Sequence, residues 1–351
     1  MVWQSALGGV AGGIDRLFHA AVLNRSRPSS AESLSPVARI RLLEELLARL
    51  AQDPWTDDEL FPAPAVPEIT QTEVRSTSIP AENSTVSIHD LSYVSPHRVI
   101  YDQVRERWAR YPQNQRVHAR FVHQGDRRPT LIFLHGYLGG PYPVEERVWP
   151  LRWLQQKGVN AVLFTLPFHG ARRRSKGAPP FPAADPTFTI EGFRQAILDL
   201  HALIRWLRDR GAPKIGLVGM SLGGYTTALA ATTLDLDVAV PFIPLASIAD
   251  FARDGGRLIG TPTQRREQHE FLERVYASVS PLTRAPRVPV EGRLVIGGKH
   301  DHITPIAHAE RLANHFETPL VTFEGGHLLQ LDRSRGFRAL GRMLGSLGWF
   351  A

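Results

Sequence analysis

Short apolar runs alternate with longer amphipathic stretches from about residue 95 to the end of the chain. The runs of Val, Ile, Leu and Phe are typical of buried strands, and the apolar residues between them recur at helical spacing. This rhythm predicts strands joined by crossover helices, and therefore a mostly parallel sheet with helices on both faces. The expected strands are 117–123, 130–135, 161–166, 214–219, 238–245, 293–297 and 319–323, and the expected helices are 148–157, 190–210, 222–233, 305–316 and 334–347.

The first 94 residues follow a different pattern. Apolar residues at helical spacing predict one helix within residues 1–24 and a second over residues 36–50. A Ser- and Pro-rich linker separates them, and a Pro-rich run over 54–67 cannot form a regular helix. We therefore expect residues 1–94 to form a helical and Pro-rich extension, and residues 95–351 to form one α/β domain.

The helix predicted within residues 1–24 does not look like a targeting or membrane segment. Two Gly pairs, Gly8-Gly9 and Gly12-Gly13, interrupt it, and Asp15 breaks the continuous apolar segment that a signal peptide needs. It also has few of the basic residues that surface-seeking helices usually carry. We expect it to pack on its own domain in a cytoplasmic protein, with peripheral contact with a membrane as the alternative.

Composition narrows the class of protein. The chain has 351 residues, of which 43% are hydrophobic and 21% charged, the balance of a globular protein. No run of eighteen apolar residues is present, which excludes a spanning helix, and the lack of cysteine excludes thiolate catalysis and Cys-ligated zinc. The net charge is +7, but the basic residues are scattered and accompany no nucleic-acid motif, so we expect no nucleic-acid partner.

The strongest chemical signal is the pentapeptide Gly-Met-Ser-Leu-Gly at residues 219–223. It lies between a predicted buried strand and a predicted helix, the setting of a G-x-S-x-G nucleophile elbow. The serine of such an elbow occupies a sharp turn that presents its hydroxyl above the edge of the sheet. Flanking glycines are needed there because neighbouring backbones come too close for side chains. The pattern predicts Ser221 as a nucleophile.

A serine hydroxyl needs a base that is itself held by a third group. On this architecture the chain order is Ser, then acid, then His. Asp301 follows the predicted strand 293–297, and His327 follows the predicted strand 319–323 after a pair of glycines. We predict Asp301 as the acid and His327 as the base. Asp250, after the predicted strand 238–245, is the alternative acid.

The three loops Gly-Met-Ser-Leu-Gly, Gly-Lys-His-Asp-His-Ile-Thr-Pro and Gly-Gly-His resemble the catalytic loops of the α/β-hydrolase superfamily. The resemblance covers about residues 95–351, and within the superfamily the sequence is similar to the dienelactone-hydrolase-like and acyl-hydrolase branches. It implies an α/β-hydrolase fold in which Ser221 is the nucleophile and His327 the general base and acid. Asp301 is then the carboxylate that fixes the imidazole tautomer.

An acyl transfer also needs two donors for the oxyanion that develops. The amide of Leu222, directly after the nucleophile, is one expected donor. The loop His135-Gly136-Tyr137 is similar to the His-Gly-x loop of the superfamily, which implies the amide of Tyr137 as the second. We expect His135 itself to be a structural residue.

These expectations combine into a serine hydrolase. We expect a carboxylic ester hydrolase, esterase- or lipase-like, which acts through an acyl-enzyme. Its substrate is expected to be a small ester with an apolar acyl part. About residues 247–290 are expected to form a small cap over the site. The alternatives are an acyl-amide or peptide hydrolase on the same residues, and a non-catalytic binding protein on the same fold. No cofactor or metal is expected, because no phosphate loop is present and the histidines beside Asp301 are more simply loop residues. His169 is expected in a turn, and Arg172, Arg173 and Arg174 in a solvated loop.

Overall fold

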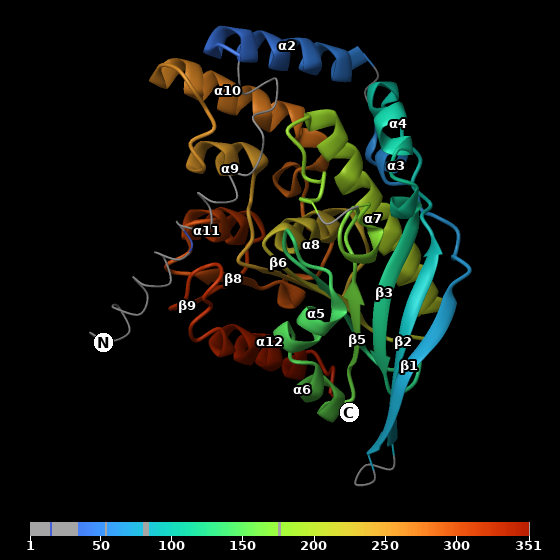
Figure 1. The fold of residues 1–351 in the computed structure, drawn as a ribbon. Helices are drawn as coiled ribbons and strands as arrows, with labels where there is room; N and C mark the ends of the chain where they lie inside the picture. The colour runs from blue at the N-terminus through green and yellow to red at the C-terminus, as the bar shows by residue number, and fades with distance from the viewer. Residues whose placement is uncertain (1–14, 16–33, 53–54, 80–83, 175–176, 351) are drawn as a thin grey trace.

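A nine-stranded sheet runs through the described part of the chain (Figure 1). The structure is a computed structural model that describes residues 15, 34–52, 55–79, 84–174 and 177–350. The strand order is β1-β2-β3-β5-β4-β6-β7-β8-β9, parallel from β5 to β9 and antiparallel from β1 through β3 to β5. The strands are β1 Thr70–Ile79, β2 Ser84–Val94, β3 Arg116–His123, β4 Thr130–Leu134, β5 Asn160–Phe164, β6 Ile215–Met220, β7 Val238–Phe242, β8 Val295–Gly298 and β9 Leu320–Phe323.

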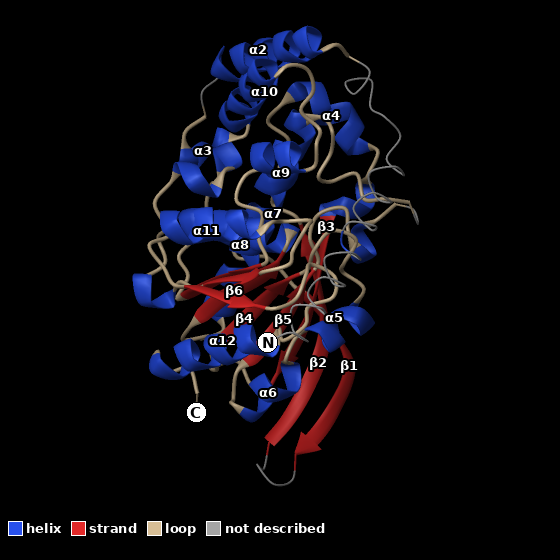
Figure 2. Cartoon of the chain, turned by 90° about the vertical axis from the view of Figure 1, so that its left-hand side faces the viewer, coloured by secondary structure: helices blue, strands red, loops and turns tan. Residues whose placement is uncertain are grey.

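Helices cover both faces of this sheet (Figure 2). Helices α7, α8 and α11 share one apolar core with the sheet, and α6 and α12 share a second core on the opposite face. The helices are α2 Pro36–Gln52, α3 Asp57–Leu60, α4 Asp102–Ala109, α5 Tyr142–Val148, α6 Leu151–Gln156, α7 Pro186–Asp209, α8 Leu222–Thr233, α9 Ile248–Asp254, α10 Pro262–Val275, α11 Ile306–His315 and α12 Ser334–Ser346. None of the helices in the described residues has both the length and the apolar character needed to cross a membrane.

The predicted α/β architecture is confirmed. Each of the seven predicted strands is present with its ends shifted by a few residues, and β4, β5, β6 and β7 are buried along their whole length. Continuous burial is what helices on both faces impose on central parallel strands. The helix predicted over 148–157 is the shorter helix α6, which begins only at Leu151, and the chain before it forms a separate helix, α5, that ends at Val148. Pro150 stands between them, and its ring cannot donate the backbone hydrogen bond of a continuous helix.

The structure corrects the prediction that residues 1–94 form only a helical and Pro-rich extension. Strand β1 pairs with β2, and β2 pairs with β3, so the sheet begins at Thr70. All side chains from Thr70 to Ser76 are exposed, as is common in an edge strand, and they carry no apolar pattern that predicts a strand. The predicted helix over 36–50 is α2. The helix predicted within residues 1–24 lies outside the described residues, except for Asp15.

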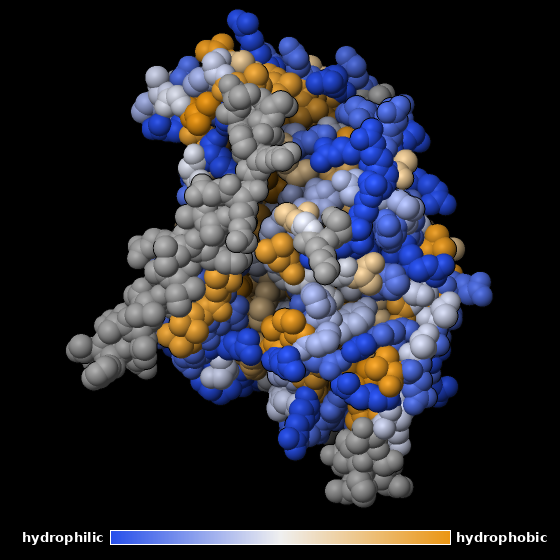
Figure 3. Space-filling view, viewed as in Figure 1, coloured by the Kyte–Doolittle hydropathy of each residue, from blue (hydrophilic) through white to orange (hydrophobic). Residues whose placement is uncertain are grey.

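The segment between β7 and β8 contains α9 and α10. Helix α10 begins at Pro262 because Thr261 and Gln264 form a capping box ahead of it. It packs along α2, and hydrophobic side chains gather where the two helices meet (Figures 1 and 3). Helix α2 and this insertion therefore stabilise one another. That the insertion covers the active site stays a prediction.

A buried ion pair connects α7 to the loop after β5. The guanidinium of Arg172 lies 2.8 Å from the Asp199 carboxylate, and both side chains are fully buried. Arg172 also donates to the carbonyl oxygens of Asn114 and Thr165. The expectation of a solvated Arg172 is therefore wrong: the 3₁₀ turn Gly170–Arg172 directs this side chain inward, while Arg174 stays exposed.

Replacing Asp199 by Ala is expected to lower the free energy of unfolding by about 3–5 kcal/mol, because it leaves the buried Arg172 charge without its counter-ion. The matched control is Asp102→Ala, which removes the exposed ion pair with Arg105 and is expected to cost at most about 1 kcal/mol. Urea unfolding of the two variants measures the difference. Equal losses would show that the buried pair is not needed for stability.

Candidate active site

Ser221 lies at the junction of β6 and α8. Its backbone has φ 55° and ψ −114°, a conformation that is rare for a residue with a side chain and that is found at functional turns. Its N–H donates to the carbonyl oxygen of Phe242 at the end of β7, at 3.1 Å. The N–H of Leu222 has no acceptor within α8, because Leu222 is the first residue of that helix. The predicted strand–turn–helix setting of Ser221 is thus present.

The glycines of this turn are required by close backbone approach. A Cβ on Gly219 would lie closer than 3.0 Å to the carbonyl oxygen of Gly223, and a Cβ on Gly223 equally close to that of Leu134. Real Cβ atoms essentially never come so near. The first turn of α8 therefore packs directly on the carboxyl end of β4, and this contact fixes the position of Ser221.

Gly223→Ala is expected to lower the free energy of unfolding by about 3 kcal/mol or more, because the added methyl meets a backbone that cannot move aside. Gly345→Ala in α12 is the matched control. The nearest atom to its new Cβ is a ring carbon of Phe350 at 3.3 Å, and alanine favours a helix. Thermal unfolding compares the two variants, and equal stability would contradict the packing described for the turn.

His327 and Asp301 are joined by a short hydrogen bond. The Nδ1–H of His327 donates to Oδ2 of Asp301 at 2.7 Å. The other oxygen, Oδ1, accepts from the N–H groups of Ile303 and Thr304 at 2.9 and 2.7 Å, and the buried carboxylate is thereby fixed. A proton held on Nδ1 leaves Nε2 unprotonated and able to accept one.

Two carboxylates determine the basicity of His327. Burial acts to lower the pKa of the imidazole, but the hydrogen-bonded Asp301 and the nearby charge of Asp15 act in the opposite sense, and the pKa is raised above its ordinary value. Both carboxylates favour the imidazolium, the form in which the ring would hold a proton taken from a nucleophile.

The loops of Ser221, Asp301 and His327 converge at the end of β7 and the start of α8. The Ser221 N–H bonds to Phe242, and the hydroxyl of Thr304 lies 3.1 Å from the carbonyl oxygen of the next residue, Ile243. The third loop, that of His327, contains Gln330, whose Nε2 donates to the carbonyl oxygen of His327 at 3.0 Å. The same Nε2 lies 3.8 Å from the sulfur of Met220, the neighbour of Ser221.

Asp250, the alternative acid, belongs to a different cluster. It lies in α9 and bonds to His269 and Arg253 at 2.8 and 2.7 Å, and to Arg311 in α11. The residue that pairs with His327 is Asp301. Asp250, His269 and Glu273 place possible metal-ligand atoms within 4.8 Å of one another, but Arg311 contacts both carboxylates and already supplies the compensating charge.

The loop after β4 passes beside Ser221. A Cβ on Gly136 would lie 3.4 Å from the Ser221 Cβ and 4.0 Å from its Oγ. The ring of His135 braces this loop: its Nδ1–H donates to the carbonyl oxygen of Gly136 at 2.8 Å and its Nε2 accepts from the N–H of Leu166 at 3.1 Å. Burial lowers the pKa of His135, which favours the neutral ring that these two bonds require.

The ring of His169 meets the ring of Tyr137, which belongs to this loop, edge to face, with ring centroids 5.7 Å apart. His169 is fully buried, its Nδ1 lies 2.8 Å from the carbonyl oxygen of Pro167, and its Nε2 has no hydrogen-bond partner among the described residues. Tyr137 is half-buried, and its hydroxyl donates to the carbonyl oxygen of Pro179. The turn expected at His169 is therefore packed against the loop that carries the predicted oxyanion donor.

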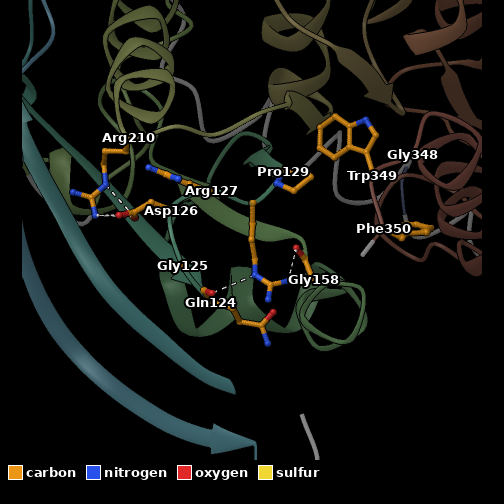
Figure 4. A pocket seen from close by; sticks show the side chains of 11 residues that line it. Gln124, Gly125, Asp126, Arg127, Pro129, Gly158, Arg210, Gly348, Trp349 and Phe350 are labelled. Atoms are coloured by element: carbon orange, nitrogen blue, oxygen red, sulfur yellow. Dashed lines mark hydrogen bonds and ion pairs between the residues drawn. The ribbon is translucent and has the colours of Figure 1, made fainter. Parts of the chain in front are cut away.

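A large surface pocket lies near the amino ends of the parallel strands, whereas Ser221 lies at their carboxyl ends (Figure 4). It has a volume of about 850 Å³ and is lined by residues next to the amino ends of β4 and β5, such as Pro129 and Gly158. Ligands of open α/β sheets bind at the carboxyl ends of the strands, where Ser221 lies. Two of the arginines of the pocket are already bonded, Arg210 to Asp126 and Arg128 to backbone carbonyl oxygens.

Two neighbours of His327 carry no signal in the sequence. Gln330 acts on a backbone carbonyl group, and Asp15 accepts hydrogen bonds from backbone N–H groups. Neither belongs to a motif, because a backbone partner places no requirement on the residue type opposite. Asp15 is moreover far from His327 in the sequence.

The sheet order, the covering helices and the turn at Ser221 define an α/β-hydrolase fold. The model of the alpha/beta hydrolase family matches residues 131–340. The chain belongs to this family.

The chain also resembles curated and solved proteins. Two uncharacterized proteins of Mycobacterium tuberculosis, from strains CDC 1551 and H37Rv, are 33% identical over 233 residues, which cover 63% of this chain and 55% of each relative. The chain thus spans about half the length of these relatives. Acetyl xylan esterase 1 from Thermoanaerobacterium sp. JW/SL YS485 matches with a TM-score of 0.57, 18% identity and coverage of 86% of this chain and 93% of that one. The acetyl xylan esterase from Paenibacillus sp. R4 matches with a TM-score of 0.54, 18% identity and coverage of 88% and 93%. At this identity the two esterases show the fold alone.

Proposed function

We propose that the protein is a serine hydrolase that cleaves carboxylic esters through an acyl-enzyme. The observation that carries the proposal is the placement of Ser221 at a strained strand–helix turn. Its neighbour Met220 contacts Gln330 on the loop of His327, and His327 is bonded to Asp301. Membership of the alpha/beta hydrolase family supports a hydrolytic reaction.

Each residue of the proposed site has its own part in the reaction. His327 takes the proton of the Ser221 hydroxyl through Nε2, and the serine oxygen attacks the ester carbonyl. The amides of Leu222 and Tyr137 hold the oxyanion that forms. The protonated imidazole then gives its proton to the departing alcohol, and water repeats the sequence on the acyl-enzyme to release the acid. Asp301 keeps the proton on Nδ1 throughout.

The surroundings of the site favour an apolar acyl group. Leu138 follows the proposed oxyanion donor, and Leu328 and Leu329 follow His327. These three leucines expose 39%, 43% and 37% of their surface, although side chains of this size are usually buried. Exposed apolar side chains on the loops that surround a reactive group are typical of a binding surface.

A panel of chromogenic substrates tests the proposal. We expect p-nitrophenyl acetate, butyrate and octanoate to be hydrolysed with a higher kcat/KM than aminoacyl p-nitroanilides of similar size. A higher kcat/KM for the anilides would favour the amide or peptide hydrolase instead. Failure to hydrolyse either series, together with failure to react with a fluorophosphonate, would favour a binding protein on the same fold.

A further inference from the structure

The carboxylate of Asp15 is buried against the backbone of the loop that carries His327. Its Oδ2 accepts from the N–H of His327 at 2.5 Å, and its Oδ1 accepts from the N–H of Leu328 at 2.9 Å. Oδ2 also lies 3.4 Å from the N–H of His302, the residue after Asp301. The Asp15 side chain is fully buried. A single carboxylate from the N-terminal segment thus connects the loops of His327 and Asp301.

The Gly-Gly-His sequence leaves room for this carboxylate. A Cβ on Gly326 would lie 2.5 Å from the Asp15 Oδ2 and 3.1 Å from the carbonyl oxygen of His300. Any residue other than glycine at 326 would therefore push Asp15 away from the amides of residues 327 and 328. Asp15 can therefore occupy this position only because residue 326 is glycine.

We propose that Asp15 is a positioning residue for His327, acting through the backbone amides at 327 and 328 and through its negative charge. Hydrogen bonds from N–H groups to a carboxylate are among the stronger ones in proteins, and two of them to one side chain restrict the loop in more than one direction. The inference rests on the proposed role of His327 as the general base. It assigns to the N-terminal segment a part in the active site that the fold alone does not require.

The charge of Asp15 adds a second effect. The charged groups that act on the His327 imidazole are Asp301, on the loop after β8, and Asp15, from the N-terminal segment. Burial lowers the pKa of the ring and the two carboxylates raise it, with the net result above the ordinary value. A general base acts when neutral, so kcat/KM falls as the pH drops through this pKa. Removal of the Asp15 charge lowers the pKa of His327 and moves that fall to lower pH.

The test compares Asp15→Asn with Asp58→Asn in the full chain. Asn is nearly the same size as Asp but is uncharged, and Asp58 is an exposed aspartate in α3. For p-nitrophenyl butyrate we expect Asp15→Asn to lower kcat about 10- to 100-fold, with KM little changed, because misplacement of a catalytic group costs this much. We also expect the acid limb of its kcat/KM profile to move to lower pH. Asp58→Asn is expected to match the parent in both respects.

An unchanged kcat and an unchanged acid limb in Asp15→Asn would overturn the proposal, whereas an inactive parent would count against the proposed function instead. Hydrogen exchange of the parent protein tests the contact independently of activity and of the folding of any variant. The N–H groups of His327 and Leu328 are expected to exchange slowly, although Leu328 is 43% exposed. Rapid exchange of both amides would overturn the proposal.

Discussion

Ser221→Ala is expected to reduce kcat for ester hydrolysis by about 10⁶-fold, because no acyl-enzyme forms without the serine oxygen. Initial rates with p-nitrophenyl butyrate measure the loss. The parent Ser221 has φ 55° and ψ −114°, a sparsely populated conformation that costs a residue with a Cβ about 1–3 kcal/mol, and the substitution does not relieve this cost. Ser221→Gly, which removes both the hydroxyl and the strain, is expected to be equally inactive and slightly more stable.

The matched control is Ser346→Ala. Ser346 is exposed at the end of α12, where its hydroxyl donates to the carbonyl oxygen of Met343. Its hydroxyl bonds within its own helix, so turnover is expected to equal that of the parent. Ester hydrolysis that survives in both Ser221 variants would refute the role of this residue.

Asp301→Asn is expected to lower kcat by about 10⁴-fold with little effect on KM. The carboxylate oxygen that faces His327 accepts the Nδ1–H at 2.7 Å. An amide cannot replace it in the same way: its oxygen is already needed by the N–H groups of Ile303 and Thr304, and its NH₂ group would favour a proton on Nε2 instead. Nε2 of His327 would then already carry a proton and could not accept the proton of the serine hydroxyl.

Asp250→Asn is the matched control for Asp301→Asn, since Asp250 is the other aspartate that the sequence offers as the acid. Its hydrogen bonds go to His269 and Arg311 rather than to His327, so the variant is expected to keep kcat within a few-fold of the parent. Thermal unfolding shows whether each variant folds. A greater loss of kcat in folded Asp250→Asn than in Asp301→Asn would reverse the assignment.

The sequence predicts those parts of the fold whose physical cause is local. Strands β4 and β6 consist almost entirely of buried apolar residues and glycine, and α8 begins at Leu222, directly after Ser221, so pattern and turn chemistry agree there. The exposed strand β1 is different. It is stabilised by pairing with β2, and pairing between backbones leaves little trace in the side chains of an edge strand.

The same limit applies to the site. Ser221, Asp301 and His327 stand at the ends of recognisable strands, and the geometry between His327 and Asp301 follows from the parallel order of β8 and β9. The prediction of a solvated Arg172 is wrong because the counter-ion of Arg172, Asp199, lies on a different element, and the basic run in the sequence does not reveal that partner. Asp15 is more distant still, and it recognises amides that every residue possesses. Long-range contacts to backbone or to a buried charge need the three-dimensional structure.

Covalent labelling tests the central claim, that Ser221 is the nucleophile of an acyl-transfer site. The full chain is treated with a fluorophosphonate and digested, and the modified residue is identified by mass spectrometry. We predict one phosphonylated serine, Ser221, with labelling lost in Ser221→Ala and much slower in Asp301→Asn. An unlabelled Ser221 in a protein that hydrolyses p-nitrophenyl esters would contradict the account.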